Sequence, residues 1–358
     1  MKVTKITITL LLIFLVSACH VFLGPDPDNS PRGIFERIWN DFNETYALFD
    51  IKEIDWDEIY KKYSPKIHNG MGNYDLFIVC SQMLNELDDY HVALASPFGV
   101  SYLLNNPGMD YLDMVYNERE MFSLRVVRGG YLDTGAKYAG GGRIMYGKIK
   151  PDKSRHPVGY IYIEDFLSSG LGLDPISDWA KEIDGIIQAM EDTDWLILDI
   201  RNNGGGLGSN MDYIAGRFAA VRKDYIKSST KNGPGRNDFS APLTWSVQPA
   251  GTRYTKQVVL LTNRETASAG EWFATALRTQ SHVTIVGQTT NGAFSTRVVR
   301  PLVNGWEYTV SVQKVTDIDG IPLEGKGVIP DHAIENTWEE LSSYLDSQLE
   351  YAVDMFQG

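Results

Sequence analysis

The sequence has few cysteines and no excess of positive charge. Only Cys19 and Cys80 occur among 358 residues. Cys80 ends an apolar run, residues 76–80, which predicts a buried thiol. No Cys/His spacing typical of a metal site is present, so we expect no metal and no cofactor. The formal net charge is −13. This argues against sequence-independent nucleic acid binding, which depends on Lys and Arg neutralising phosphates.

The apolar stretch near the start is too short to span a bilayer with ease. Residues 6–18 follow two lysines and have the size of a signal-peptide core. The stretch ends in Val-Ser-Ala directly before Cys19, which resembles a bacterial lipobox. We therefore predict a signal peptide over residues 1–18, a lipid on Cys19 and a tether over residues 19–31. The protein would then be lipid-anchored to an extracytoplasmic membrane face; an ordinary signal peptide is the alternative.

The rest of the chain, 43% hydrophobic overall, can bury a sizeable core. In residues 32–95, apolar side chains recur every four positions and acids mark a helix start, which predicts an N-terminal helical domain. Residues 96–153 alternate apolar runs with Gly and Asn turns, which predicts loops and hairpins. From residue 154 to 358, strand-like and helix-like runs alternate, which predicts an α/β core.

Ser268 lies where a strand-like run, residues 256–261, gives way to a helix-like one. A serine just before a helix is often an N-cap, and Glu271 stands three residues later, as in a capping box. The alternative is a nucleophile presented on a strand-to-helix turn.

Three glycines, residues 204–206, follow the apolar run at residues 195–200. Consecutive glycines let the backbone turn tightly and point N–H groups at a ligand. The loop lacks the Lys-Ser/Thr of a P-loop and the spaced glycines of a dinucleotide fingerprint, so nucleotide binding is weakly supported. A simple turn is the other interpretation.

His91 follows a predicted helix and two acids. A histidine in this setting is often structural, and it becomes a candidate base only if a nucleophile needs one. None of the other five histidines has a better local setting.

Five segments together resemble a known family. They are residues 87–91, 198–206, 266–271, 286–292 and 327–331. In this order they resemble the motifs of the tail-specific, or carboxyl-terminal processing, serine protease family. The resemblance implies an α/β fold with a core of the crotonase or caseinolytic-protease type, built of repeated strand-strand-helix units, behind an N-terminal helical bundle.

The family has two catalytic arrangements. In the better known one a lysine activates the serine, but the matching position here is Ala293, which cannot act as a base. The other resembles the core of the tricorn protease and uses serine, histidine and glutamate, which match Ser268, His91 and Glu324. In the tricorn pattern a serine precedes the histidine, and Tyr90 stands there in this chain.

The chemistry expected from these residues is acyl transfer from a peptide. The histidine would deprotonate the serine, and the glutamate would fix the imidazole directly or through an intermediate group. The backbone N–H of Ala269, with that of Gly204 or Gly205, would hold the oxyanion. Glu324 also has a simpler interpretation, as a surface acid beside Lys326.

We therefore expect a serine endopeptidase that cleaves peptides or unfolded proteins outside the cytoplasm. The alternative is a catalytically inactive surface lipoprotein that binds a peptide or a small apolar ligand on the same scaffold. A thioester enzyme of the crotonase type is a third interpretation. Little room exists for a PDZ module between residues 91 and 158, and no Gly-Leu-Gly-Phe-like loop occurs there, so we do not expect recognition of free carboxyl termini.

Overall fold

The structure is a computed structural model that describes residues 28–97, 101–103, 123–169 and 175–357. The predicted signal peptide, Cys19 and most of the tether lie outside these residues. Within them, no helix has the length and apolar character needed to cross a bilayer.

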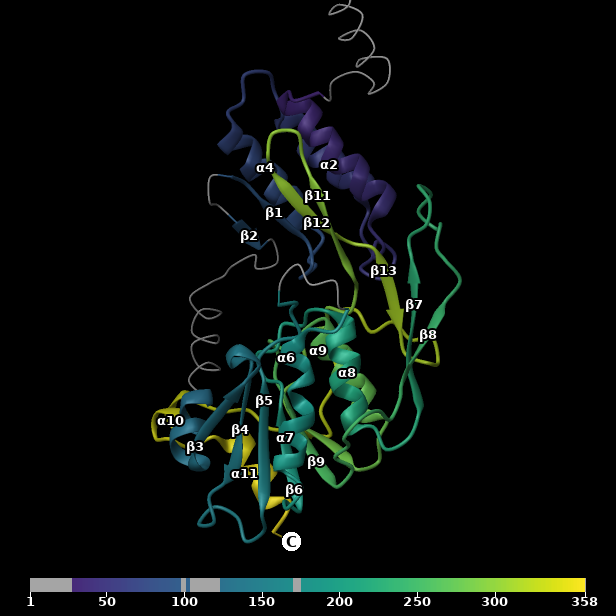
Figure 1. Ribbon diagram of the computed structural model, residues 1–358. Helices are drawn as coiled ribbons and strands as arrows, with labels where there is room; N and C mark the ends of the chain where they lie inside the picture. Colours follow the sequence, from purple (N-terminus) through teal and green to yellow (C-terminus); the bar gives the residue numbers. More distant parts are fainter. Residues whose placement is uncertain (1–27, 98–100, 104–122, 170–174, 358) are drawn as a thin grey trace, which may run out of the picture.

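Helices form the first part of the N-terminal unit that the structure describes (Figure 1). They are α2 Pro31–Thr45, α3 Trp56–Tyr63 and α4 Asn73–Asn85, with a 3-10 turn at Ser64–Lys66. Local chemistry explains two of the helix starts. The Ser30 hydroxyl accepts the N–H of Gly33 at 3.1 Å, and the Asp55 carboxylate accepts the N–H of Glu58 at 3.1 Å.

A four-stranded sheet completes this unit, and half of it comes from far along the chain. The strands are β1 Ala93–Ala95, β2 Ser101–Leu103, β11 Arg297–Pro301 and β12 Glu307–Ser311, in the order β11-β12-β1-β2. Trp306 and Tyr308 are buried in the same cluster as Trp56 of α3. Residues 297–311 therefore belong to the N-terminal unit, which corrects the domain boundaries predicted from the sequence.

The core is built on a seven-stranded sheet of order β14-β10-β9-β6-β5-β4-β3. In chain order its strands are β3 Leu132–Ala139, β4 Ile144–Ile149, β5 Val158–Ile163, β6 Trp195–Asp199, β9 Gln257–Thr262, β10 Val283–Gly287 and β14 His332–Ala333. Pairing is parallel from β5 to β14 and antiparallel among β3, β4 and β5. The hairpin β3-β4 was predicted, but it lies in the core sheet, so the core begins before residue 154.

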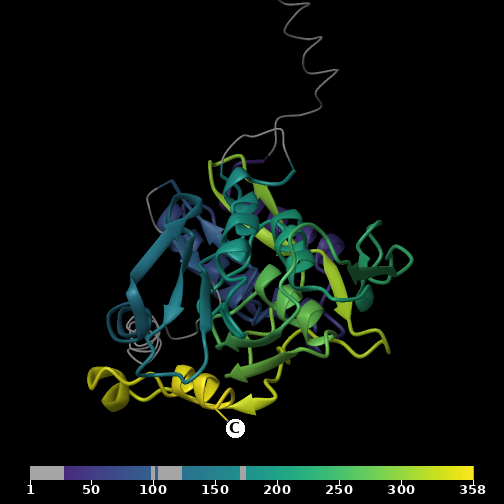
Figure 2. The same cartoon turned by 60° about the horizontal axis from the view of Figure 1, so that its bottom comes forward.

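Helices cover both faces of this sheet (Figure 2). One face carries α6 Asp178–Lys181, α7 Ile183–Ala189, α8 Gly208–Phe218 and α9 Ala269–Arg278, and the other carries α11 Ser347–Asp354. Leu198 enters the first layer and its neighbour Ile197 the second. Successive strand side chains point to opposite faces, so a strand covered on both sides is apolar throughout.

The remaining elements are short or lie at the margin. A three-stranded sheet, β13-β7-β8, extends beside the core (Figure 1). Its strands are β7 Lys223–Thr230, β8 Leu243–Val247 and β13 Gln313–Thr316. Short helical segments occupy Val127–Tyr131, Gly140–Gly142 and α10 Trp338–Ser342.

The carboxyl ends of β6 and β9 lie side by side, with Asp199 paired to Leu261. β6 runs into the glycine loop and β9 into the turn that carries Ser268. In open α/β sheets ligands bind outside the carboxyl ends of the strands. The two segments predicted to carry chemistry therefore meet at one edge of the sheet.

Candidate functional site

Ser268 occupies a strained turn at the start of α9. Its φ is 55° and its ψ −123°, whereas an ordinary N-cap residue is extended. Its N–H lies within hydrogen-bond distance of the Ala293 carbonyl oxygen, at 3.0 Å, and of Glu271 Oε2, at 3.2 Å. Glu271 returns to the Ser268 N–H as in a capping box, but the Ser268 hydroxyl makes no side-chain cap hydrogen bond within the described residues. The backbone strain is what a nucleophile on a sharp strand-to-helix turn requires.

The glycine loop packs directly on this turn. A Cβ added to Gly205 would lie 2.6 Å from the Cβ of Ser268 and 2.8 Å from the nitrogen of Ala269, and the φ of Gly205 is 92°. Asn203 ties the segments together, because its carbonyl accepts the N–H of Ala267 at 3.0 Å and its side-chain amide donates to Ile163 at 3.0 Å. Only glycine fits at position 205 in this arrangement.

Two backbone N–H groups remain available for an oxyanion. In the described part of the chain, neither Ala269 nor Gly204 donates its N–H to an acceptor. Gly205 does: its N–H goes to Asn203 Oδ1 at 2.9 Å. The sequence predicted that either Gly204 or Gly205 could supply the second N–H donor to the oxyanion. In the described residues, the N–H of Gly204 is the one of the two that is left for this role.

His91 lies on the turn between α4 and β1 and is 3% exposed. Its N–H donates to Asp89 Oδ1 at 2.8 Å, and its carbonyl accepts the Thr309 hydroxyl at 2.6 Å. Burial lowers the pKa of the ring to about 4, partly opposed by the charge of Asp89, so the imidazole is neutral at pH 7. Its Nδ1 has no hydrogen-bond partner, and no hydrogen bond joins His91 to Ser268 or Glu324 within the described residues.

The neighbour of His91 lies against the glycine loop. A Cβ added to Gly204 would lie 3.8 Å from the hydroxyl oxygen of Tyr90. The N-terminal unit therefore reaches the edge of the sheet where Ser268 lies.

Glu324 is 5% exposed, so its interpretation as a surface acid beside Lys326 is wrong. Its Oε2 accepts the N–H groups of Phe294 and Ser295, at 2.9 and 3.0 Å. Ala293, the residue before this pair, accepts the N–H of Ser268. The structure thus brings Glu324 and Ser268 to the same segment. Burial, followed by the negative charge of Asp89, raises the pKa of the Glu324 carboxyl.

Asp89 and Glu271 are buried acids whose roles the sequence did not reveal. Asp89 acts electrostatically on both His91 and Glu324. Its position two residues before His91 was the available signal. Glu271 accepts the N–H groups of Gly292 and Ala293 at 2.6 and 2.7 Å, which holds that segment against the Ser268 turn.

Arg201 anchors the chain just before the glycine loop. It is fully buried, with Nε 2.9 Å from Asp199 Oδ1 and Nη1 2.9 Å from Asp346 Oδ2. Asp346 also caps α11 by accepting the N–H of Leu349. The C-terminal helix is therefore tied by buried charges to the end of β6.

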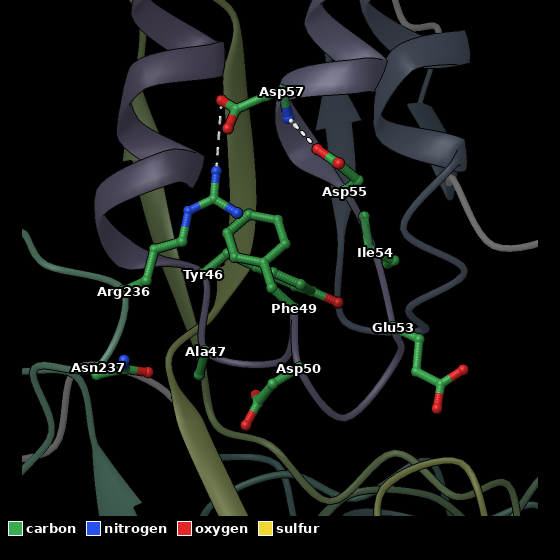
Figure 3. A pocket seen from close by; sticks show the side chains of 10 residues that line it. All are labelled: Tyr46, Ala47, Phe49, Asp50, Glu53, Ile54, Asp55, Asp57, Arg236 and Asn237. Atoms are coloured by element: carbon green, nitrogen blue, oxygen red, sulfur yellow. Dashed lines mark hydrogen bonds and ion pairs between the residues drawn. The ribbon is translucent and has the colours of Figure 1, made fainter.

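A cavity of about 180 Å³ opens beside Ser268 and Ala269. A larger one, about 540 Å³, lies between residues 46–57 and the β7-β8 hairpin (Figure 3). Arg236 crosses its rim, with Nη2 3.5 Å from Asp57 Oδ1. Its lining contains no serine, cysteine or histidine. Nucleophilic chemistry therefore belongs to the smaller cavity.

In the described part of the chain, no cluster of three or more His, Cys, Asp or Glu could hold a metal ion.

Comparison with known proteins supports this assignment. Residues 157–334 match peptidase family S41, and residues 27–85 match the tricorn protease C1 domain. A crystal structure assigned as a peptidase, from Parabacteroides merdae ATCC 43184, is 30% identical with a TM-score of 0.74, and the match covers 92% of this chain and 98% of that one. These similarities confirm the predicted fold class.

Two further similarities are more distant. The carboxy-terminal processing protease CtpB of Bacillus subtilis (strain 168) is 27% identical over 180 residues, which cover 50% of this chain and 34% of that protein. This chain spans less than half the length of the curated carboxy-terminal processing proteases that it matches. Mature CPAF in complex with lactacystin has 13% identity and a TM-score of 0.66, over 91% of this chain and 97% of that one, and it shares the fold.

Proposed function

The chain belongs to peptidase family S41, and on that premise we propose that it is a serine endopeptidase with Ser268 as its nucleophile. The observation that carries the proposal is the strained turn at Ser268, packed against a glycine loop, where the N–H groups of Ala269 and Gly204 have no acceptor among the described residues. Strain of this kind costs about 1–3 kcal/mol and persists where the surrounding structure enforces it.

In the proposed reaction, the Ser268 hydroxyl attacks the scissile carbonyl while His91 accepts its proton. The neutral imidazole is the form that can do so. The tetrahedral oxyanion lies between the N–H groups of Ala269 and Gly204, each worth about 3 kcal/mol in the transition state. His91 then returns the proton to the leaving amine, and water repeats the sequence to release the acyl group.

The proposal includes an approach of His91 to Ser268 when substrate binds. Catalytic hydrogen bonds are often long or misaligned before substrate is present. The Nδ1 of His91, which has no partner among the described residues, would then carry the proton and donate it to a positioning carboxylate, and the negative charge of Asp89 stabilises the protonated ring. We assign Glu324 the role of a positioning residue.

A fluorophosphonate probe tests the nucleophile, because it reacts with an activated serine irrespective of the peptide sequence. We expect labelling of Ser268 in the wild type and none in Ser268→Ala. His91→Ala should lower the labelling rate by at least about 100-fold, the contribution typical of a general base. His282→Ala is the matched control, because His282 is also buried but lies after α9. A protein that resists the probe altogether would favour the inactive binding protein, and labelling that survives in Ser268→Ala would overturn the assignment of Ser268 as the nucleophile.

We further propose that the protein acts outside the cytoplasm on peptides or unfolded proteins and is anchored by a lipid on Cys19. The support is the apolar run with its small residues before Cys19. Metabolic labelling with a radioactive fatty acid tests it. We expect the wild-type protein to carry the label. The Cys19→Ala protein should carry no label and should be lost from the membrane fraction. An unlabelled wild-type protein would contradict the lipid anchor.

A further inference from the structure

The cavity beside Ser268 has room for one side chain. Its volume is about 180 Å³. A protein cavity of about 150 Å³ holds a benzene molecule. Its apolar walls come from Met211, Trp245, Trp272 and Phe294. A single large side chain of a substrate therefore fits, whereas a longer stretch of peptide does not.

The two tryptophans form a rigid aromatic wall. Their ring centroids are 5.2 Å apart with planes at 72°. The Nε1–H of Trp272 donates to the Phe294 carbonyl at 3.0 Å, and that of Trp245 donates to Ser228 Oγ at 2.9 Å. With both polar edges already bonded, the rings offer faces to a ligand. Such faces accept either an aliphatic stem or a cation.

Asp212 is the charged group of this cavity. It lies on α8 at the cavity mouth, in contact with solvent, and the surrounding protein raises the pKa of its carboxyl to about 6 by desolvation. In the described part of the chain, no hydrogen bond or ion pair reaches this carboxylate. Apart from Ser268, the other polar side chains of the wall have partners: the Ser295 hydroxyl bonds to the Thr296 carbonyl, and the Gln313 amide bonds to Thr296 and Thr230.

We propose that this cavity receives a lysine or arginine side chain of the substrate, with its stem against Trp245 and Trp272 and its cation paired to Asp212. The inference rests on the proposed peptidase function. A basic side chain satisfies all three features, since it brings an apolar stem, a cation for the aromatic faces and a counter-charge for the lone acid. The net charge of −13 also attracts basic substrates.

The basic residue supplies the acyl group rather than the leaving amine. The leaving amine takes its proton from His91 and must lie on the side of the base. Neither Tyr90 nor His91 lines this cavity, so the base is not part of its wall. The side chain that enters it therefore belongs to the residue that stays bound to Ser268 as the acyl intermediate.

A panel of peptides that differ only at this residue tests the inference. Norleucine matches the stem of lysine without its charge. We expect kcat/KM for Lys and Arg to exceed that for norleucine by about tenfold or more, the lower end of what a charged hydrogen-bond partner contributes. Asp212→Asn should bring the ratio of Lys to norleucine close to one. Asp178→Asn, an exposed acid on α6, is the matched control and should leave the ratio unchanged.

The outcomes separate this inference from the proposed function. If Ser268 is labelled by the fluorophosphonate but norleucine or leucine is preferred, the basic specificity is wrong and the peptidase stands. The same holds if Asp212→Asn keeps the wild-type ratio. If Ser268 is not labelled and no peptide is cleaved, the proposed function fails first.

Discussion

Gly205 is the position where one methyl group tests the architecture of the site most directly. Its φ of 92° costs an alanine about 1–2 kcal/mol. The new Cβ would also lie 2.6 Å from the Cβ of Ser268, so the loop or the serine turn must move. A displacement of about 1 Å at reacting groups costs roughly 100-fold in rate. We therefore expect Gly205→Ala to lower the rate of fluorophosphonate labelling of Ser268 by about 100-fold or more.

Gly135→Ala is the matched control for this experiment. Gly135 has a φ of 83°, but no described atom would lie within 4 Å of its added Cβ. It therefore carries the backbone cost without the contact. Labelling rates by mass spectrometry and thermal unfolding should show destabilisation in both variants and loss of labelling in Gly205→Ala alone. Wild-type labelling of Gly205→Ala would refute the close packing of loop and turn, and an equal loss in Gly135→Ala would assign the effect to general destabilisation.

Three other predictions concern buried charged or titratable groups. Burial lowers the pKa of His91 to about 4. The rate of fluorophosphonate labelling of Ser268 should therefore persist below pH 6.5 and fall only as the pH drops through about 4. A loss of labelling centred near pH 6.5 would contradict a buried imidazole. Arg201→Met leaves two buried carboxylates without a counter-charge and should lower the free energy of unfolding in urea by about 3–5 kcal/mol, against less than about 1 kcal/mol for Lys61→Met at an exposed ion pair. Burial raises the pKa of Glu271 to about 7, so the folded state holds its proton more tightly than the unfolded chain does. That contribution to stability is present below about pH 4.5 and is lost as the pH rises through 7, which amounts to about 2–3 kcal/mol between pH 5 and 8. Glu271→Gln should remove this difference, and a variant with an unchanged pH dependence of unfolding would show that another group is responsible.

The candidate site is divided between two units of the fold. Ser268 and Glu324 lie on segments that the core sheet holds together, whereas His91 comes from the N-terminal unit. The two units are joined by β11 and β12, which leave the core and pair with β1 beside His91. Any adjustment between the units changes the distance from imidazole to hydroxyl, which gives the proposed approach of His91 a structural basis.

Local patterns in the sequence were sufficient for the parts of the site that depend on neighbouring residues. A buried strand followed by three glycines predicts a tight loop with exposed N–H groups, and a serine between a strand and a helix predicts a sharp turn. The replacement of the family's lysine by Ala293 could also be read directly. Each of these features depends on only a few consecutive residues, because turns and helix starts are determined by local backbone preferences.

Tertiary structure alone decided which groups are buried, paired or free. The burial of Glu324 and the electrostatic effect of Asp89 on it depend on segments far apart in the chain. The same holds for Asp212, which the packing of α8 against α9 brings into the same cavity as Ser268. Amino-acid order constrains local backbone geometry strongly, but burial and electrostatic environment arise only when remote segments exclude water together.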